Sequence, residues 1–313
     1  MFIVKYRKVW YTISILMVAA SVVVYTMWGL KYGIDFTGGS LMEVQYSTTT
    51  PTPTAADIVA QLGTAGVEGA SVRPTGEKGY FIRTPFLPPE QYALVKTALS
   101  KGGTLAYEEK SFDSIGPSIG TELRTRALYA IVLVLLAIAL FIAFVFRKVS
   151  KPVSSWKYGV VALISLAHDV MVPLGAFVLL GHFMGAEVDT LFVTALLVVL
   201  GFSVHDTIVV FDRVRENLKK NEEHHTHEPF EETVGKSVKQ TLARSINTSL
   251  TTVLALLALY FFGAEPTRYF SLTLLIGIIA GTYSSVFIGS PLLVTLQKMQ
   301  KEPVVVEEKK KKK

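Results

Sequence analysis

Residues 201–216 read GFSVHDTIVVFDRVRE, a stretch that begins inside a long apolar run and ends in charged residues. The apolar run extends from Leu191 to Phe211 and contains His205 and Asp206. A carboxylate inside an apolar span costs roughly 2.5–3.5 kcal/mol on insertion scales, and such a residue usually faces a protein interior or an ion pathway. The stretch therefore predicts a membrane span and marks Asp206 as a candidate functional residue.

The composition of the whole chain agrees with a membrane protein. Of its 313 residues, 50% are hydrophobic and only 18% are charged, which is unusual for a soluble domain. The formal net charge of +6 favours contact with anionic lipid over binding of nucleic acid. The chain has no cysteine, which excludes a disulfide framework and thiolate chemistry.

Six stretches are long and apolar enough to cross about 30 Å of hydrocarbon, which takes about 20 residues. They cover residues 9–30, 127–146, 158–180, 189–211, 244–263 and 268–296. Lysine and arginine gather before the first span, in the second–third and fourth–fifth connections, and after the sixth, whereas the third–fourth connection has none. Because basic loops stay in the cytoplasm, we expect a multi-pass protein with both termini cytoplasmic and a retained first span.

A large polar segment, residues 31–126, separates the first two spans and is expected to be extracytoplasmic. Alternating and helical patterns predict strands at 41–46, 70–73, 79–84 and 104–112, with helices at 55–62 and from Pro88 to about Gly102. The order β-α-β-β-α-β is that of a ferredoxin-like α+β domain. The fold class is thus an α-helical integral membrane protein with six transmembrane helices and one such domain.

The chain divides by these patterns into four parts. They are a cytoplasmic N-terminus with the first span (1–32), the extracytoplasmic domain (33–125), a five-helix portion (126–297) that includes a cytoplasmic loop (212–243), and a basic tail (298–313). Within the loop, residues 231–240 are expected to form a basic helix. The run Lys309–Lys313 is interpreted as a disordered tail within reach of anionic lipid. Three histidines in the loop, His224, His225 and His227, fit no standard metal spacing, so no metal is expected.

No phosphate-binding loop, zinc-protease motif or serine-hydrolase motif is present, so catalysis and a bound cofactor are not expected. The remaining chemistry lies in ionisable residues at membrane depth, namely Asp169, Asp206 and Arg244. Asp206 and Arg244 both lie toward the cytoplasmic ends of their spans, so a pair between them is geometrically possible. Burial disfavours an ionised aspartate and a nearby arginine favours it, so movement of Arg244 could load or release a proton.

Structural interpretations of these residues stay open beside the functional ones. Asp206 and Arg244 could form an interhelical pair or reach the membrane interface, and the residues alone do not decide between this and proton transfer. For Asp169, hydrogen-bonded packing is favoured over a relay. His205 points about 100° away from Asp206 on a helix, so the two do not form a ready-made dyad.

Small residues recur every four positions in the sixth span, which predicts close contact with another helix. Packing within the bundle is favoured over an interface with a second subunit. The residues of this small-residue seam are Gly277, Gly281, Ser285 and Gly289.

Several short motifs occur together, in order, along the predicted spans. They are GIDFTGGS (33–40), ISLAHD (164–169), HDTIVVFDRVRE (205–216), RSINTSLT (244–251) and GTYSS (281–285). With these motifs the chain resembles the SecF-type membrane subunits of the SecD/SecF family, which belongs to the resistance-nodulation-division (RND) superfamily of proton-driven transporters. The similarity covers nearly the whole chain.

The resemblance implies a non-enzymatic accessory subunit of protein export in the bacterial cytoplasmic membrane. Its expected partners are SecD, the SecYEG channel with other Sec accessory subunits, and the translocating preprotein, with protons as the coupling ion. The resemblance places Asp206 and Arg244 at proton-pathway positions, beside Asp169 and His205, of which His205 stands where an asparagine is expected.

The resemblance also implies that Asp35, Gly38 and Gly39 form a hinge between the first span and the extracytoplasmic domain. Two other functions remain possible. An RND-type efflux subunit for small molecules or lipids usually carries twelve spans in one chain, which is twice the number expected here. A simple membrane anchor would leave Asp169, Asp206 and Arg244 without a role.

Overall fold

A computed structural model describes residues 2–47, 52–147, 153–226 and 228–299 of the chain, which forms two compact units. The predicted basic tail from residue 300 onward, including Lys309–Lys313, lies outside the described residues. The first unit, called the helical unit, comprises Met1–Gly29, Val132–Met184 and Thr194–Lys313. The second, called the α+β unit, comprises Leu30–Ile131 and also Gly185–Val193, the connection before the fourth span.

Six helices among the described residues are long and apolar enough to cross a membrane, which confirms the predicted fold class. The first is α2, which follows the short helix α1 (Phe2–Lys5), and the sixth is divided by a π-helix, η1. The helices are α2 (Arg7–Trp28), α6 (Pro117–Val145), α7 (Ser155–Phe183), α8 (Thr190–Glu223), α9 (Phe230–Phe262), and α10 (Glu265–Ser284) with η1 (Ser285–Gly289) and α11 (Ser290–Lys298).

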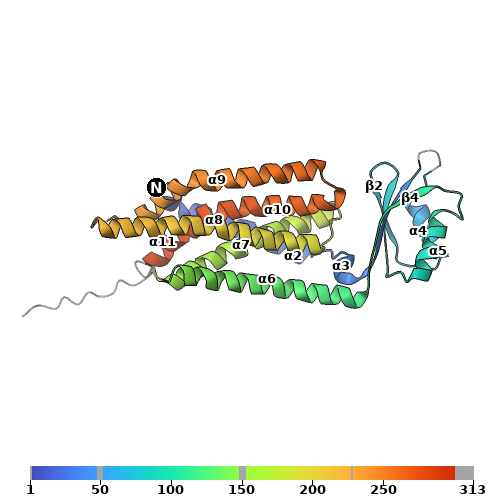
Figure 1. The fold of residues 1–313 in the computed structure, drawn as a ribbon, viewed down its shortest axis with the longest axis horizontal. Coiled ribbons are helices and arrows are strands. Elements are labelled where there is room, and N and C mark those ends of the chain that lie inside the picture. The colour runs from blue at the N-terminus through green and yellow to red at the C-terminus, as the bar shows by residue number, and fades with distance from the viewer. Residues whose placement is uncertain (1, 48–51, 148–152, 227, 300–313) are drawn as a thin grey trace, which may run out of the picture. The chain divides into compact units, whose positions relative to one another are not determined.

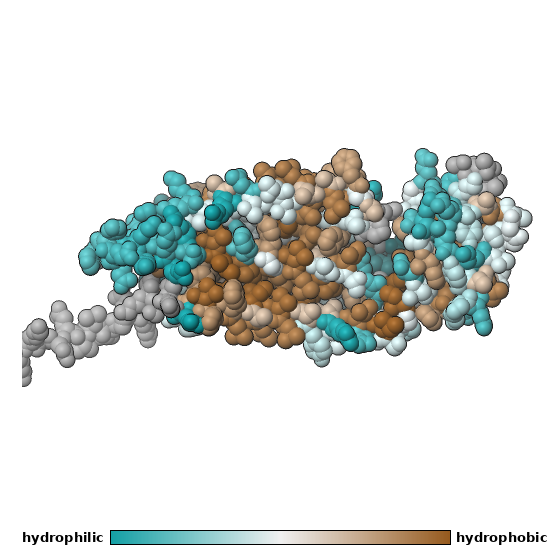
Figure 2. Space-filling model, in the orientation of Figure 1, coloured by the Kyte–Doolittle hydropathy of each residue, from teal (hydrophilic) through white to brown (hydrophobic). Residues whose placement is uncertain are grey.

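In the helical unit, α9 and α10 lie side by side, and α2 packs against α7 (Figure 1). On the face shown in Figure 2, apolar side chains cover the middle of the helical unit, and hydrophilic side chains gather at the end where α8 extends farthest. The interior contains an aromatic cluster in which the Tyr158 ring lies 5.2 Å from that of Phe146 and 5.3 Å from that of Phe211, measured between ring centroids. This cluster joins α7 and α8 to residue 146, just beyond α6.

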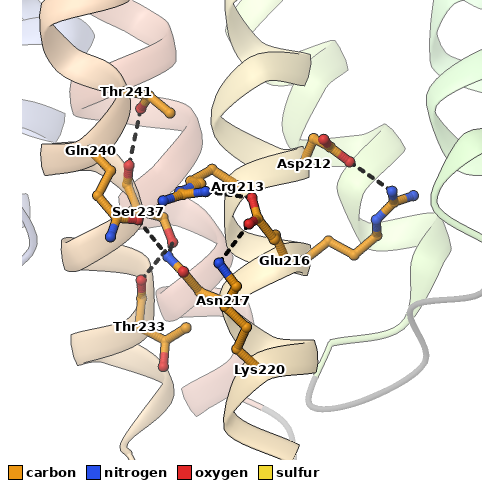
Figure 3. Close-up of polar contacts among 10 residues, drawn as sticks. Asp212, Arg213, Glu216, Asn217, Lys220, Thr233, Ser237, Gln240 and Thr241 are labelled. Atoms are coloured by element: carbon orange, nitrogen blue, oxygen red, sulfur yellow. Dashed lines mark hydrogen bonds and ion pairs between the residues drawn. The ribbon is translucent and has the colours of Figure 1, made fainter. Parts of the chain in front are cut away.

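The segment 212–243, predicted as a cytoplasmic loop with a helix over 231–240, is helical over most of its length. α8 continues to Glu223 and α9 begins at Phe230, so only 224–229 connect them. Charged side chains one turn apart support the extension of α8: Glu216 accepts hydrogen bonds from Arg213 at 2.5 Å and Lys220 at 2.7 Å (Figure 3). Hydropathy alone misses such a continuation because the charges end the apolar window but not the helix.

A buried asparagine joins the two helical extensions. The amide nitrogen of Asn217 donates to Ser237 Oγ at 2.8 Å and to Gln240 Oε1 at 2.9 Å (Figure 3). Arg213 Nε also donates to Gln240, at 2.7 Å. Because polar groups removed from water must find partners, these bonds hold the ends of α8 and α9 together as a helical hairpin.

The domain that follows the first span has the predicted ferredoxin-like order. Its four strands form one antiparallel sheet in the order β2-β3-β1-β4, with two helices in the connections. A short helix, α3 (Ile34–Thr37), precedes it. The elements are β1 (Gly39–Tyr46), α4 (Ala55–Thr64), β2 (Ser71–Thr75), β3 (Gly79–Thr84), α5 (Pro89–Leu99) and β4 (Tyr107–Ile115).

Alternation along β1 builds the core of this domain. Met42, Val44 and Tyr46 are buried and pack with Ile58, Leu62, Ile82, Val95 and Leu99. The predicted N-cap of α4 is also present: Thr54 Oγ1 accepts from the Asp57 amide at 3.2 Å, and Asp57 accepts from the Thr54 amide at 2.9 Å. This reciprocal pair satisfies two groups that the start of a helix leaves unpaired.

Gly38 and Gly39 lie where the chain crosses the beginning of α6. Their φ angles are +73° and +127°, a region that side chains rarely adopt. A Cβ on Gly38 would lie 2.7 Å from Pro117 Cα, and one on Gly120 would lie 2.7 Å from Gly38 N. The two segments therefore approach closely because glycine occupies both sides of the crossing. Whether the pair also acts as a hinge stays a prediction.

We predict that Gly120→Ala lowers the thermal unfolding temperature of the full chain in detergent. A helical glycine replaced by alanine normally gains about 0.5–1 kcal/mol, but here the new methyl group would collide with the backbone of Gly38. The matched control is Gly63→Ala in α4, where nothing lies within 4 Å of the new Cβ. A rise in unfolding temperature for both variants would contradict the tight crossing.

Candidate functional site

Asp206 lies on the buried face of α8 and is only 6% exposed. Its carboxylate oxygens accept hydrogen bonds from two serine hydroxyls on other spans. Ser245 of α9 donates to Oδ1, and Ser285, the first residue of η1, donates to Oδ2. Three spans therefore meet at one carboxylate.

Asp169 forms a second buried centre on α7, with no exposed surface. Ser203 Oγ of α8 donates to its Oδ2 at 2.5 Å, and Ser284 Oγ of α10 donates to the same oxygen at 2.7 Å. The neighbouring His168 places Nδ1 at 2.8 Å from Oδ1, whereas its buried Nε2 has no hydrogen-bond partner within the described part of the chain. Asp169 is thus surrounded by hydrogen-bonding groups from three spans.

The two carboxylates are linked through the same two spans. Ser284 and Ser285 are consecutive residues, yet the first donates to Asp169 and the second to Asp206. The π-helix begins at Ser285, and the Ser290 hydroxyl donates to the carbonyl of Ser285 at 2.9 Å. Single π-turns inside α-helices are frequent at functional sites. Here one turn presents adjacent hydroxyls to two different acids.

The small-residue seam of the sixth span lies against other helices of the helical unit. A Cβ on Gly277 would collide with Val199 of α8, and one on Gly281 would lie 3.0 Å from Ser203 Cβ. Gly289 faces Ser165 of α7 in the same way. The seam lets the sixth span approach closely enough for short serine hydroxyls to reach the carboxylates.

Arg244 does not contact Asp206, although the sequence left this pair open. Its side chain is exposed, and it forms no ion pair with any described residue. The adjacent residue Ser245 takes that place at the carboxylate. His205 is also exposed, on a different face of α8 from Asp206. The structure therefore brings Asp206 and Asp169 into the interior and leaves Arg244 and His205 on its surface.

Arg244 belongs to a polar face of α9. Asn247, Thr248 and Thr251 follow it at intervals of three and four residues, and all are exposed. This spacing puts them on one side of a helix. Ionisable residues in a span rarely face lipid, so this face points to contact with something other than hydrocarbon.

At its other end, α8 begins beside two carboxylates. Asp189 Oδ1 accepts from the Phe192 amide at 2.7 Å, and Asp35 Oδ2 accepts from the Thr190 amide at 2.8 Å. Asp35, predicted as part of a hinge, is therefore in contact with the first turn of α8.

These features define a class: a polytopic membrane protein with two hydrogen-bonded carboxylates inside its bundle and a ferredoxin-like domain after its first span. The family described as "Protein export membrane protein SecD/SecF, C-terminal" matches residues 94–299, and the "SecD/SecF GG Motif" matches residues 29–50. The chain belongs to the SecD/SecF family.

Curated relatives extend the similarity over almost the full chain. "Protein translocase subunit SecF" of Thermobaculum terrenum is 43% identical and covers 94% of this chain and 93% of its own length. The protein of the same name from Anaerolinea thermophila is 39% identical, over 92% and 91%. No group of acidic, histidine or cysteine residues suited to a metal occurs among the described residues; His227 lies outside them.

A solved structure has the same fold. The crystal structure of SecDF from Thermus thermophilus, described as a translocon-associated membrane protein, matches with a TM-score of 0.79 and 31% identity. The match covers 95% of this chain but 38% of the SecDF chain. This chain therefore corresponds to just over a third of that longer protein.

We predict that Ser245→Ala and Ser285→Ala each lower the unfolding temperature of the isolated chain. Each removes one hydroxyl donor from a buried carboxylate, and an unsatisfied buried acceptor costs about 1–3 kcal/mol. Thr251→Ala is the control, because the Thr251 hydroxyl is exposed and donates to the Thr248 carbonyl of its own helix. Serine variants as stable as this control would show that the hydroxyls do not support Asp206.

Proposed function

We propose that this chain is an accessory subunit of the Sec protein-translocation machinery. Together with a SecD partner, it uses the proton-motive force to promote preprotein export across the cytoplasmic membrane. The observation that carries the proposal is the buried carboxylate of Asp206, held by hydroxyls from two other spans. The curated relatives, named as translocase subunits, favour export over the efflux alternative.

The hydrogen-bond partners of Asp206 are compatible with reversible protonation of its carboxylate. A serine hydroxyl can donate to an ionised carboxylate or accept from a protonated one, so Ser245 and Ser285 can serve both forms by rotation. Protonation of Asp206 changes which of these hydrogen bonds are present, and so changes how α8 is held by α9 and η1. One charge crossing 100 mV is worth about 2.3 kcal/mol, which shifts a two-state ratio by roughly fifty-fold.

We propose that Asp169 and His168 form a second proton-binding site on the same proton pathway as Asp206. Ser203, which bonds Asp169, lies three residues before Asp206 on α8, and Ser284 and Ser285 connect the acids on the other side. The His168 ring lies beside Asp169, with Nδ1 at 2.8 Å from Oδ1. No ligand other than the proton is proposed for this site, and no enzymatic activity.

The exposed polar face of α9 supports a second half-bundle as the partner. In Thermus thermophilus, a relative named SecDF is 35% identical and is matched over 35% of its length, which leaves room for a SecD portion in the same chain. We propose that SecD covers Arg244 and its polar neighbours. The SecYEG channel, other Sec accessory subunits, preprotein and anionic lipid are proposed as further contacts.

The chain is a multi-pass membrane protein, and we propose that both its termini are cytoplasmic in a bacterial inner membrane. Basic residues support this orientation. Arg7 at the start of α2 and Lys298 at the end of α11 both pair with Glu231 at the start of α9, which brings two positive charges together at this end of the helical unit. The α+β domain is then extracytoplasmic.

We predict that Asp206→Asn removes the stimulation of preprotein export by a proton gradient. The amide keeps the shape of the side chain but cannot exchange a proton, so stimulation should fall at least ten-fold while assembly with SecD persists. The measurement is export into vesicles that contain SecD and the channel, with and without an imposed gradient. Asp212→Asn, on the exposed part of the same helix, is the matched control. Full stimulation of the Asp206 variant would refute the proton-carrier role.

We predict that Arg244→Met leaves the unfolding temperature of the isolated chain unchanged but abolishes gradient-dependent export. The exposed guanidinium stabilises nothing within the described chain, whereas in the complex it faces the partner. Arg215→Met, which removes an exposed arginine from the extension of α8, serves as the control for loss of charge. A variant that unfolds early or fails to accumulate would instead assign Arg244 a structural role in this subunit.

A further inference from the structure

We propose that Asp35 and Glu187 form a latch that fixes the first turn of α8 to the α+β domain, so that movement of α8 is passed on to that domain. The latch comprises Asp35 and Glu187 with their partners Thr190, Arg73 and Arg83. The inference rests on the proposed function, since it assumes that protonation of Asp206 moves α8. It gives Asp35 a positioning role that differs from a hinge.

The connection between α7 and α8 belongs to the α+β unit. Its Val188 amide donates to the Lys31 carbonyl at 2.7 Å, and the Gly33 amide donates to the Val188 carbonyl at 2.8 Å. These bonds make Tyr32 and Val188 partners in a parallel bridge. The segment after the first span and the segment before the fourth are therefore joined as in a small sheet.

Glu187 ties this connection to the domain's sheet. Its two carboxylate oxygens each pair with a different arginine, Arg73 of β2 at 3.0 Å and Arg83 of β3 at 2.8 Å. Arg73 also donates to the Gly185 carbonyl at 2.5 Å, and Arg83 donates to the Tyr32 carbonyl at 3.1 Å. The Glu187 side chain is 23% exposed, so water only partly screens the two ion pairs. Each arginine thus binds both the Glu187 carboxylate and a backbone carbonyl of one of the two bridged segments.

Asp35 holds the helix itself. Its Oδ2 accepts from both the backbone nitrogen of Thr190, at 2.8 Å, and the Thr190 hydroxyl, at 2.7 Å. A carboxylate at a helix N-terminus satisfies an unpaired amide and interacts favourably with the helix dipole. Most helices take such a cap from their own adjoining residues, as α8 also does from Asp189. The extra cap comes from a residue 155 positions earlier in the chain.

The same helix carries Asp206. α8 is continuous from Thr190 to Glu223, so the latch and the acid are 16 residues apart on one rod, about 24 Å at ~1.5 Å per residue. A rigid helix conveys a displacement to its ends. A flexible connection at Thr190 would absorb that displacement. Here the connection is held by the ion pairs of Glu187, by the Asp35 cap on Thr190 and by the backbone bridge between Tyr32 and Val188. The contacts therefore suit a link that stays closed while α8 moves.

The test uses the full complex with SecD and the channel, and compares gradient-dependent export. Asp35→Ala and Glu187→Ala should each reduce the stimulation at least five-fold, with normal accumulation and normal co-purification of SecD. Asp57→Ala, which removes the carboxylate from the cap of α4 in the same domain, is the matched control and should keep the stimulation. The chain has no cysteine, so a Tyr32→Cys/Val188→Cys pair can replace the latch by a single covalent bond.

Oxidation of this cysteine pair should restore export in the Glu187→Ala background and should leave export unchanged in an otherwise native chain. Reduction should remove the rescue. Should Asp35→Ala fail to accumulate, the Glu187→Ala variant and its rescue decide the question. The inference would be overturned if the Asp35→Ala and Glu187→Ala variants kept full stimulation. It would also be overturned if the disulfide between positions 32 and 188 did not form, or if this disulfide stopped export. A native complex that shows no gradient-dependent export would instead refute the proposed function, and this inference with it.

Discussion

A carboxylate inside an apolar bundle must find polar partners within the protein, because lipid and apolar side chains provide none. At Asp206 these partners are two hydroxyls, Ser245 on α9 and Ser285 on the sixth span. Since a serine side chain is short, both helices must approach α8 closely. The glycines of the sixth span permit that approach, as the contact of Gly281 with Ser203 illustrates. The hydrogen bonds to Asp206 therefore depend on close packing of the helices around it.

Much of the fold could be predicted because its determinants are local. Apolar length gives the six spans, and alternation with turn residues gives the ferredoxin-like order, including β3 at Gly79–Thr84 as predicted. Within 212–243 the pattern predicts a helix over 231–240 but not the continuation of α8 to Glu223, because charge ends a hydropathy window without ending a helix. What keeps that region helical is pairing between α8 and α9 through Asn217, and sequence patterns do not record which residues meet across a hairpin.

The acids of the site could be predicted because a charge inside an apolar run is conspicuous, whereas their partners could not. Serine is common in spans and often bonds its own helix, as Ser249 does to the Ser245 carbonyl. Nothing in the pattern distinguishes that role from the bond between Ser245 and Asp206. The orientation of Arg244 was equally undetermined, because adjacent residues of a helix differ by about 100° and only the packing decides which one faces inward.

The contacts of α8 suggest how a small chemical change can have an extended effect. The helix is held at its first turn by Asp35 and at its far end by Asn217, and between these points Asp206 joins it to two other spans. α8 is thus held by side-chain hydrogen bonds at its first turn, at Asp206 and in its extension beyond the apolar run. If protonation of Asp206 moves α8, as proposed, the segments that these side chains hold would move with it. The exposed polar face of α9, which includes Arg244, adjoins Ser245, so a change at Asp206 lies one residue away from that surface.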